Sequence, residues 1–209
     1  MSCFTLTLLP QILSTTPTPL PAPPPGPEKA ERDAYGLTNV VTSENFAVRW
    51  GSGGSVTEAD VGRVVESLER SWEKEIDDLG MPAPYGTDSW LFNVYIGDTG
   101  GPSSSGVYGY YSTDLDGWPM VVLSPDMVAA SSSTVTTIPH EFFHALQAEA
   151  GGYAYSGESA WWWEATATWM ESVVYPADPS YAVFLFGFAF LPHCLLYTSD
   201  AADDLYRGD

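Results

Sequence analysis

The pattern of apolar positions predicts one long amphipathic helix between Thr57 and Gly80. Apolar side chains recur there every three or four residues, which places them along one helical face: Val61, Val64, Val65, Leu68, Trp72, Ile76 and Leu79. Thr57 is a suitable N-cap, and Gly80 followed by Pro82 ends the helix. The acidic residues between the apolar ones are expected on the solvent-facing side of the helix: Glu66, Glu69, Glu73 and Glu75.

Four short apolar runs predict the strands of a small sheet. They span residues 45–50, 90–96, 107–113 and 120–123, and turns rich in glycine, serine or aspartate separate them. The apolar face of the long helix is expected to pack on this sheet.

Two further helices are expected in the second half of the chain. The first ends at Gly151 and begins near residue 136, or near residue 133 with a kink at Pro139, because proline fits easily only in a first turn. Its core-facing side is predicted to consist of Ile138, Phe142, Ala145, Leu146 and Glu149. The second helix runs from about residue 159 to 174, and one face is expected to carry Trp161, Glu164, Thr168 and Glu171.

The chemistry of the chain concentrates in the first of these two helices. His140 and His144 lie four residues apart with Glu141 beside the first, so the sequence reads His-Glu-x-x-His. On a helix this spacing puts both imidazoles on one face, where they can hold one Zn²⁺ at about 2.0–2.1 Å. A catalytic zinc site needs a third protein ligand and an open position. Glu164, after 19 intervening residues, is the candidate for that ligand.

Residues 140–147 read HEFFHALQ, and residues 161–171 read WWWEATATWME. Together they resemble the gluzincins, zinc metallopeptidases of the thermolysin and membrane-alanyl-aminopeptidase kind, and most closely a group of secreted bacterial metalloproteases. The resemblance implies an α+β, zincin-like fold and hydrolysis of peptide bonds. It implies that His140, His144 and Glu164 bind zinc and that Glu141 is the general base. Metzincins would need glycine at position 147 and histidine at position 150, where this chain has glutamine and alanine.

The resemblance leaves two supporting roles open. Thermolysin-like enzymes often carry an aspartate four residues after the ligand glutamate, and it orients a zinc histidine. Thr168 stands at that position here, and Glu171, one turn further along, is the second candidate. Gluzincins usually stabilise the oxyanion with a tyrosine or histidine further downstream, and the nearest candidates are Tyr175 and Tyr181.

Charge and hydropathy narrow the choice of partners. The 209 residues include 27 acidic and 7 basic ones, a net charge of −20, which repels nucleic acid and anionic membranes. The longest apolar run, residues 181–191, is too short to span a bilayer, which takes about 20 residues. The resemblance implies a peptide or protein substrate, and the high acidity suits a location outside the cytoplasm. The pattern predicts no oligomeric state.

The two ends differ from the region between them. Residues 1–34 read as a leader and a proline-rich linker, residues 35–192 as the catalytic domain, and residues 193–209 as a tail that resembles translated sequencing-adapter read-through. The natural chain is thus expected to continue differently beyond Pro192. Cys3 and Cys194 are not expected to form a disulfide or to bind zinc.

Two classes of function fit these observations. The first is a zinc metallopeptidase, and the second is a catalytically inactive zincin-fold module that binds metal or protein. The complete set of two histidines, Glu141 and Glu164 favours the enzyme, because an inactive module would have no need for the general base.

Overall fold

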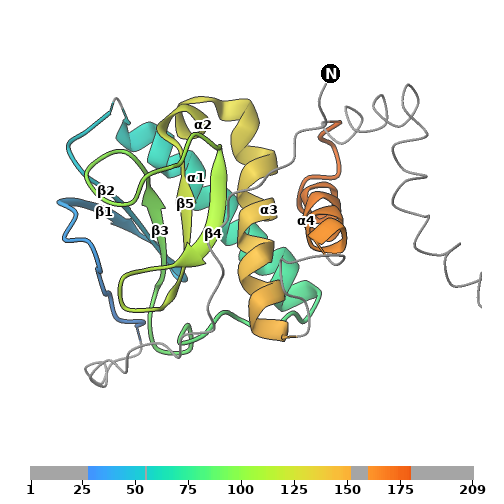
Figure 1. Cartoon of the computed structure of the whole chain (residues 1–209). Coiled ribbons are helices and arrows are strands. Elements are labelled where there is room, and N and C mark those ends of the chain that lie inside the picture. The colour runs from blue at the N-terminus through green and yellow to red at the C-terminus, as the bar shows by residue number, and fades with distance from the viewer. Residues whose placement is uncertain (1–27, 55, 152–159, 180–209) are drawn as a thin grey trace, which may run out of the picture.

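A five-stranded mixed sheet with helices packed against it forms an α+β fold (Figure 1). The computed structural model describes residues 28–54, 56–151 and 160–179. The strands are β1 (Asn39–Thr42), β2 (Phe46–Trp50), β3 (Phe92–Ile96), β4 (Gly109–Thr113) and β5 (Pro119–Leu123). The helices are α1 (Glu58–Trp72), the π-helical turn η1 (Glu73–Asp78), α2 (Pro125–Ala129), α3 (Ser131–Ala150) and α4 (Ala160–Val174).

The strand order β1-β2-β3-β5-β4 places three parallel strands at the centre and an antiparallel strand at each edge. All residues of β2, β3 and β5 are buried, as expected for parallel strands covered on both faces. Both edge strands are only partly buried. Among the described residues, β4 has no further strand on its outer side, and it lies beside α3.

The helices cover one face of the sheet, and the segment that precedes β1 covers the other. The larger core joins inward residues of β2, β3 and β5 to α1, α2, α3 and α4. On the opposite face, Tyr95, Met120 and Val122 pack with Tyr35 and Leu37. Figure 1 shows α3 standing between the sheet and α4, so one long helix contacts both parts of the fold.

The long predicted helix is confirmed, and its N-terminus has the expected cap. The Thr57 hydroxyl accepts from the Asp60 amide, while the Asp60 carboxylate accepts from the Thr57 amide, which together form a capping box. The helix continues through η1 and ends before Gly80, whose φ of 71° needs glycine.

Several predicted boundaries were wrong for tertiary reasons. The second predicted strand begins at Phe92 rather than at residue 90, because Trp90 forms only an isolated bridge with Ala30. The third begins at Gly109 rather than at residue 107. The sequence pattern missed β1 and α2 because both are short. Of the two predicted starts for the metal helix, the earlier one agrees with the structure: α3 begins at Ser131, two residues before the predicted position, so that Pro139 lies inside it.

Residues before the predicted domain boundary at residue 35 also take part in the fold. The Leu91 amide donates to the Ala30 carbonyl at 2.9 Å, and Arg32 forms a buried ion pair with Asp114. Arg32 also lies 4.7 Å from the centre of a Trp118 ring. Part of the predicted leader therefore covers the sheet. The predictions for Cys3, Cys194, the apolar run 181–191 and the tail 193–209 fall outside the described residues.

None of the described helices is long and apolar enough to cross a membrane.

The predicted position of Glu75 on the polar side of its helix was wrong. This residue continues the buried stripe of α1, and it is 0 % exposed. Neither of its carboxyl oxygens has a hydrogen-bond partner that meets the usual geometry. Burial raises the pKa of Glu75 well above its usual value, although nearby Ser71 and the charge of His140 act in the opposite direction. Burial therefore favours the protonated form of Glu75 in the folded protein. The prediction for Glu149 was also wrong: it is exposed, because it lies in the last turn of α3 beyond the core.

We expect Glu75 to make folding stability decrease as pH rises above about 4.5, the usual pKa of a glutamate. The unfolded chain loses this proton at a lower pH than the folded chain does. Between the two pKa values, the free energy of unfolding should therefore fall by about 1.4 kcal/mol per pH unit. Urea unfolding of the wild type and of Glu75→Gln, from about pH 5 to pH 8, measures the difference.

Glu73→Gln is the matched control, because Glu73 is exposed in the same turn. Its unfolding free energy should change with pH in parallel with that of the wild type. A constant difference between the wild type and Glu75→Gln over this range would show that Glu75 is not the source of the slope.

Candidate metal centre

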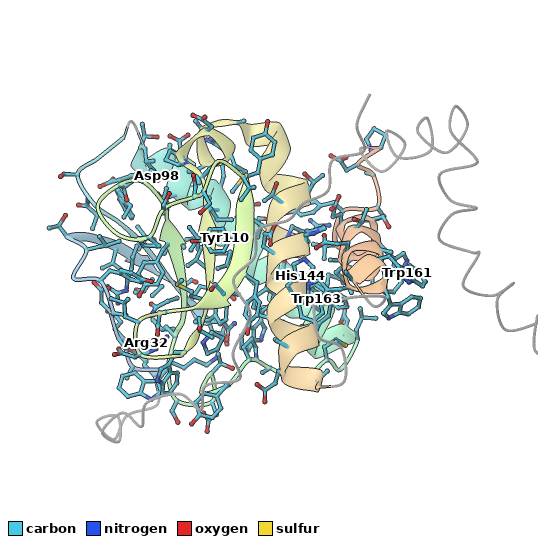
Figure 2. All side chains as sticks on the ribbon, in the orientation of Figure 1. Arg32, Asp98, Tyr110, His144, Trp161 and Trp163 are labelled. Carbon is cyan, nitrogen blue, oxygen red and sulfur yellow. The ribbon has the colours of Figure 1, made fainter. Side chains whose placement is uncertain are left out.

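Helix α3 presents His140 and His144 on one face, one turn apart. Figure 2 shows His144 on the side of α3 that faces α4. Their ring centres are 4.8 Å apart and the rings are perpendicular. His144 is 5 % exposed, so its ring is fixed within the protein. Helix α4 packs across this face of α3 and supplies acidic side chains from its second and fourth turns.

His140, His144 and Glu164 form the one group of three potential metal ligands among the described residues. Their ligand atoms all lie within 4.8 Å of one another. Nε2 of His140 lies 3.2 Å from one oxygen of Glu164, and Nε2 of His144 lies 3.8 Å from the other. Tetrahedral bonds of about 2.0–2.1 Å separate ligand atoms by roughly 3.3 Å. The arrangement therefore fits a metal ion of this size with little movement.

The other ring nitrogen of each imidazole, Nδ1, also forms a hydrogen bond. Nδ1 of His140 lies 2.8 Å from Glu171, and Nδ1 of His144 lies 2.7 Å from the amide oxygen of Gln147. A carboxylate and an amide oxygen can only accept, so Nδ1 is the donor in both pairs. Both Nε2 atoms then face Glu164, as metal binding requires.

Gln147 ties the second histidine to α4. Its Nε2 donates to the Trp163 carbonyl at 3.1 Å and to the Thr166 hydroxyl at 2.7 Å. The Trp163 ring is stacked on the His144 ring at 5.0 Å and 8°. The hydrogen bond from Gln147 thus fixes the His144 ring within its plane, and the stacked Trp163 ring supports one face of it.

Glu141 points from α3 toward the edge strand β4. A Cβ atom at Gly109 on β4 would lie 2.8 Å from Cγ of Glu141, so this approach needs glycine. The Tyr111 amide donates to the Glu141 carboxyl, and the charges of His140 and Glu164 also act on it. Burial raises the pKa of Glu141 to about 7.

The pKa values of the three grouped residues follow from their contacts. Burial lowers the pKa of His140, but its hydrogen bonds with Glu164 and Glu171 outweigh this and raise it to about 10. Burial and the charge of His140 lower the pKa of His144 to about 4. Burial raises the pKa of Glu164, but the two histidines reverse this and leave it below its usual value. Metal would therefore have to displace a proton from His140.

The structure separates the candidates for the supporting roles. Glu171 contacts His140, whereas Thr168 makes no hydrogen bond with either histidine in the described part of the chain. The Tyr175 hydroxyl lies 3.0 Å from Ser67 on α1, so it is directed away from the centre. Tyr181 lies outside the described residues. Trp161 was expected on the face of Glu164, but it is 58 % exposed and points away from α3 in Figure 2.

Sequence reasoning places Gln147 on the helical face of His140 and His144, but it gave no role in the centre to Gln147, Trp163 or Gly109. Gln147 stands three residues after His144, and this spacing on one helical face could have indicated the contact. The role of Gly109 depends on which strand lies beside α3, and local sequence carries no signal for that.

Comparison with known protein families matches residues 25–187 to DUF6055, a family of unknown function. No curated protein and no solved structure matches the chain.

We expect the protein to bind one divalent metal ion per chain through the grouped side chains, and His144→Ala to remove most of it. Loss of one nitrogen leaves only two protein ligands. Elemental analysis of purified protein measures the content. His193→Ala is the matched control, because His193 is the remaining histidine of the sequence. Full metal occupancy in His144→Ala would contradict the assignment.

We expect Gln147→Leu to lower metal affinity by about 10–100-fold, because His144 would lose the acceptor that fixes its ring. Competition with a metal indicator dye measures the affinity. Gln147→Glu keeps an acceptor for Nδ1 and should bind more tightly than the leucine variant. Equal affinities of wild type and Gln147→Leu would show that the Nδ1 contact does not support the centre.

Proposed function

The chain belongs to the DUF6055 family, whose function is unknown, and we propose that it is a zinc-dependent, zincin-like peptidase. The observation that carries the proposal is the convergence of His140, His144 and Glu164 beside Glu141. Two histidines, one glutamate and an open position make up the zinc sites of thermolysin and carboxypeptidase A. The resemblance of residues 140–171 to gluzincins gives the same four residues the same roles.

Zinc is the metal that suits these donors best. Two imidazole nitrogens and one carboxylate oxygen form a borderline-soft set, which zinc prefers and magnesium or calcium does not. Bound there, zinc would polarise the scissile carbonyl and lower the pKa of the attacking water. The chain's own residues supply the remaining steps.

Glu141 is placed to move the proton. Its carboxyl is held by the Tyr111 amide, and one oxygen remains to accept a proton from water and pass it to the leaving amine. Burial favours the protonated form of this carboxyl, which suits a group that takes up a proton and then releases it. Glu171 and Gln147 keep the two imidazoles in place during these steps.

The open edge of β4 offers a binding surface for an extended peptide. The Tyr108 carbonyl accepts from the Ser124 amide, and alternate residues of an antiparallel strand face the same neighbour. The backbone groups of Gly109 and Thr113 therefore face away from β5, along the side where Glu141 lies. A peptide added there as a further strand would run past the metal centre.

Hydrolysis of a quenched peptide library, with and without a chelator, tests the proposal. Cleavage should disappear on chelation and return on addition of zinc. Metal binding without any turnover in the full chain would instead favour a catalytically inactive metal-binding module.

We expect Glu141→Gln to keep the metal and the fold but to lower the rate of peptide cleavage by about 10²–10⁴-fold. The amide has the same size but cannot accept the proton. Zinc content and thermal midpoint should stay near the wild-type values. Parental activity in this variant would remove Glu141 from the mechanism.

A further inference from the structure

Every exposed residue of helix α4 is apolar. The four residues are Trp161, Trp162, Ala165 and Trp169, and the three tryptophans are 58, 43 and 56 % exposed. They form the outer face of α4, and Figure 2 shows Trp161 on the side that faces away from α3. A helix at the protein surface normally directs charged side chains to water, as α1 does with Glu66. The outer face of α4 therefore has the composition of a buried surface.

The charged side chains of α4 are directed to its other side. They are Glu164 and Glu171, and both contact His140 on α3. The hydroxyls of Thr166 and Ser172 donate to carbonyls of their own helix at 2.8 and 2.7 Å. A hydroxyl that bonds back in this way needs no water as its partner. Helix α4 is thus suited to a position between two covering elements, and α3 is one of them.

The three exposed tryptophans form one patch. Trp161 and Trp169 lie on one helical face with Ala165 between them, and the Trp162 ring centre lies 5.5 Å from that of Trp161. Elsewhere in the described part of the chain, no helix or strand carries more than one exposed large apolar side chain. A contiguous apolar patch marks an interaction site, whereas single apolar residues do not. The outer face of α4 is therefore an interaction surface.

The chain that leaves α4 is anchored close to the end of this helix. Arg70 on α1 donates to the Val174 carbonyl at 2.9 Å, and the Tyr175 hydroxyl lies 3.0 Å from Ser67. The Asp178 amide then donates to the Tyr175 carbonyl at 3.0 Å, which forms a turn directly after the helix. The residues that follow therefore begin near the C-terminal end of the outer face.

The most apolar run of the sequence, residues 181–191, begins just after this turn and lies outside the described residues. It has no charged side chain and contains four phenylalanines at alternate positions: Phe184, Phe186, Phe188 and Phe190. The outer face from Trp161 to Trp169 is about 12 Å long, and the run is about 16 Å long as a helix or about 36 Å when extended. The match to the DUF6055 family, residues 25–187, includes α4 and continues into the run. The run is thus long enough to cover the patch, and its first part belongs to the same family unit.

We propose that residues 181–191 pack along the outer face of α4, with their phenylalanines against its three tryptophans. An attached segment has a high effective concentration at this surface. A second copy of the chain is disfavoured as the cover, because it brings its own net charge of −20. Helix α4 is then held between α3 and the run. The run supports the positions of Glu164 and Glu171 without touching the candidate metal centre.

Tryptophan fluorescence of the full chain tests the cover. The other tryptophans are buried or half-buried, so quenching by acrylamide reports mainly on the outer face of α4. We expect weak quenching in the wild type. Phe188→Asp should strengthen quenching about twofold or more and shift the emission to longer wavelength, because an unpaired charge cannot stay buried. Leu115→Asp, which adds the same charge at a 73 % exposed residue between β4 and β5, should leave both values unchanged.

Limited digestion with chymotrypsin tests the same contact from the other partner. This protease cleaves after aromatic residues, and we expect the phenylalanines of the run to resist it in the wild type. Trp169→Asp changes only the outer face of α4, and it should speed cleavage within the run by about tenfold or more, because the open form becomes more populated. Leu115→Asp should be cut there at the wild-type rate.

Each outcome supports or overturns the proposal. Strong quenching of the wild type together with rapid cleavage of its run would show that the outer face is free. Protection that decreases on dilution would show that a second copy covers it, and protection unchanged in both Phe188→Asp and Trp169→Asp would exclude the run as the cover. Phe188→Ala replaces Phe188→Asp if circular dichroism shows a loss of helix in the charged variant. None of these measurements requires metal or turnover, so their outcome is independent of the proposed function.

Discussion

Two hydrogen bonds behind the imidazole rings determine whether the centre can exist. Glu171 holds Nδ1 of His140, and Gln147 holds Nδ1 of His144. A neutral imidazole has one N–H, so a bond at Nδ1 leaves the lone pair at Nε2, on the side of Glu164. Glu171 lies on α4, and Gln147 lies on α3 but donates to the Trp163 carbonyl of α4. The contact between α3 and α4 therefore matters as much as the histidines themselves.

The opposite face of α3 supplies the rigidity that this contact needs. Phe142 lies between the two histidines in sequence and points into the core, where its ring centre is 5.1 Å from Phe46, 5.5 Å from Phe92 and 6.0 Å from Trp72. Close-packed rings of this kind allow few alternative positions. The same turn of helix is thus fixed by aromatic packing on one side and carries the polar centre on the other.

The sequence was sufficient to predict those features that depend on residues close together in the chain. The period of α1, its cap at Thr57 and the spacing of His140 and His144 all follow from helical geometry within a few residues. The general α+β architecture also followed from the apolar pattern and the resemblance.

The choice between Thr168 and Glu171 could not be made in advance, because it depends on the angle at which α4 crosses α3. Glu75 was placed wrongly because the amphipathic pattern shows where acids are usual, and this one extends an apolar stripe. The close approach of Gly109 to Glu141 depends on strand order, which joins residues far apart in the chain.

The absence of lysine and arginine between Lys74 and Arg207 also bears on where the chain can be cut by other proteases. A protease that cleaves after lysine or arginine finds no site in the stretch that carries β3 to α4. This protection resides in composition rather than in folding, so it persists when the molecule opens transiently. The basic residues before β3 are different, because Arg32 and Arg49 are shielded only while their side chains are buried. Digestion of an unfolded chain by such a protease would therefore cut the N-terminal part and leave the stretch with the candidate centre in one piece.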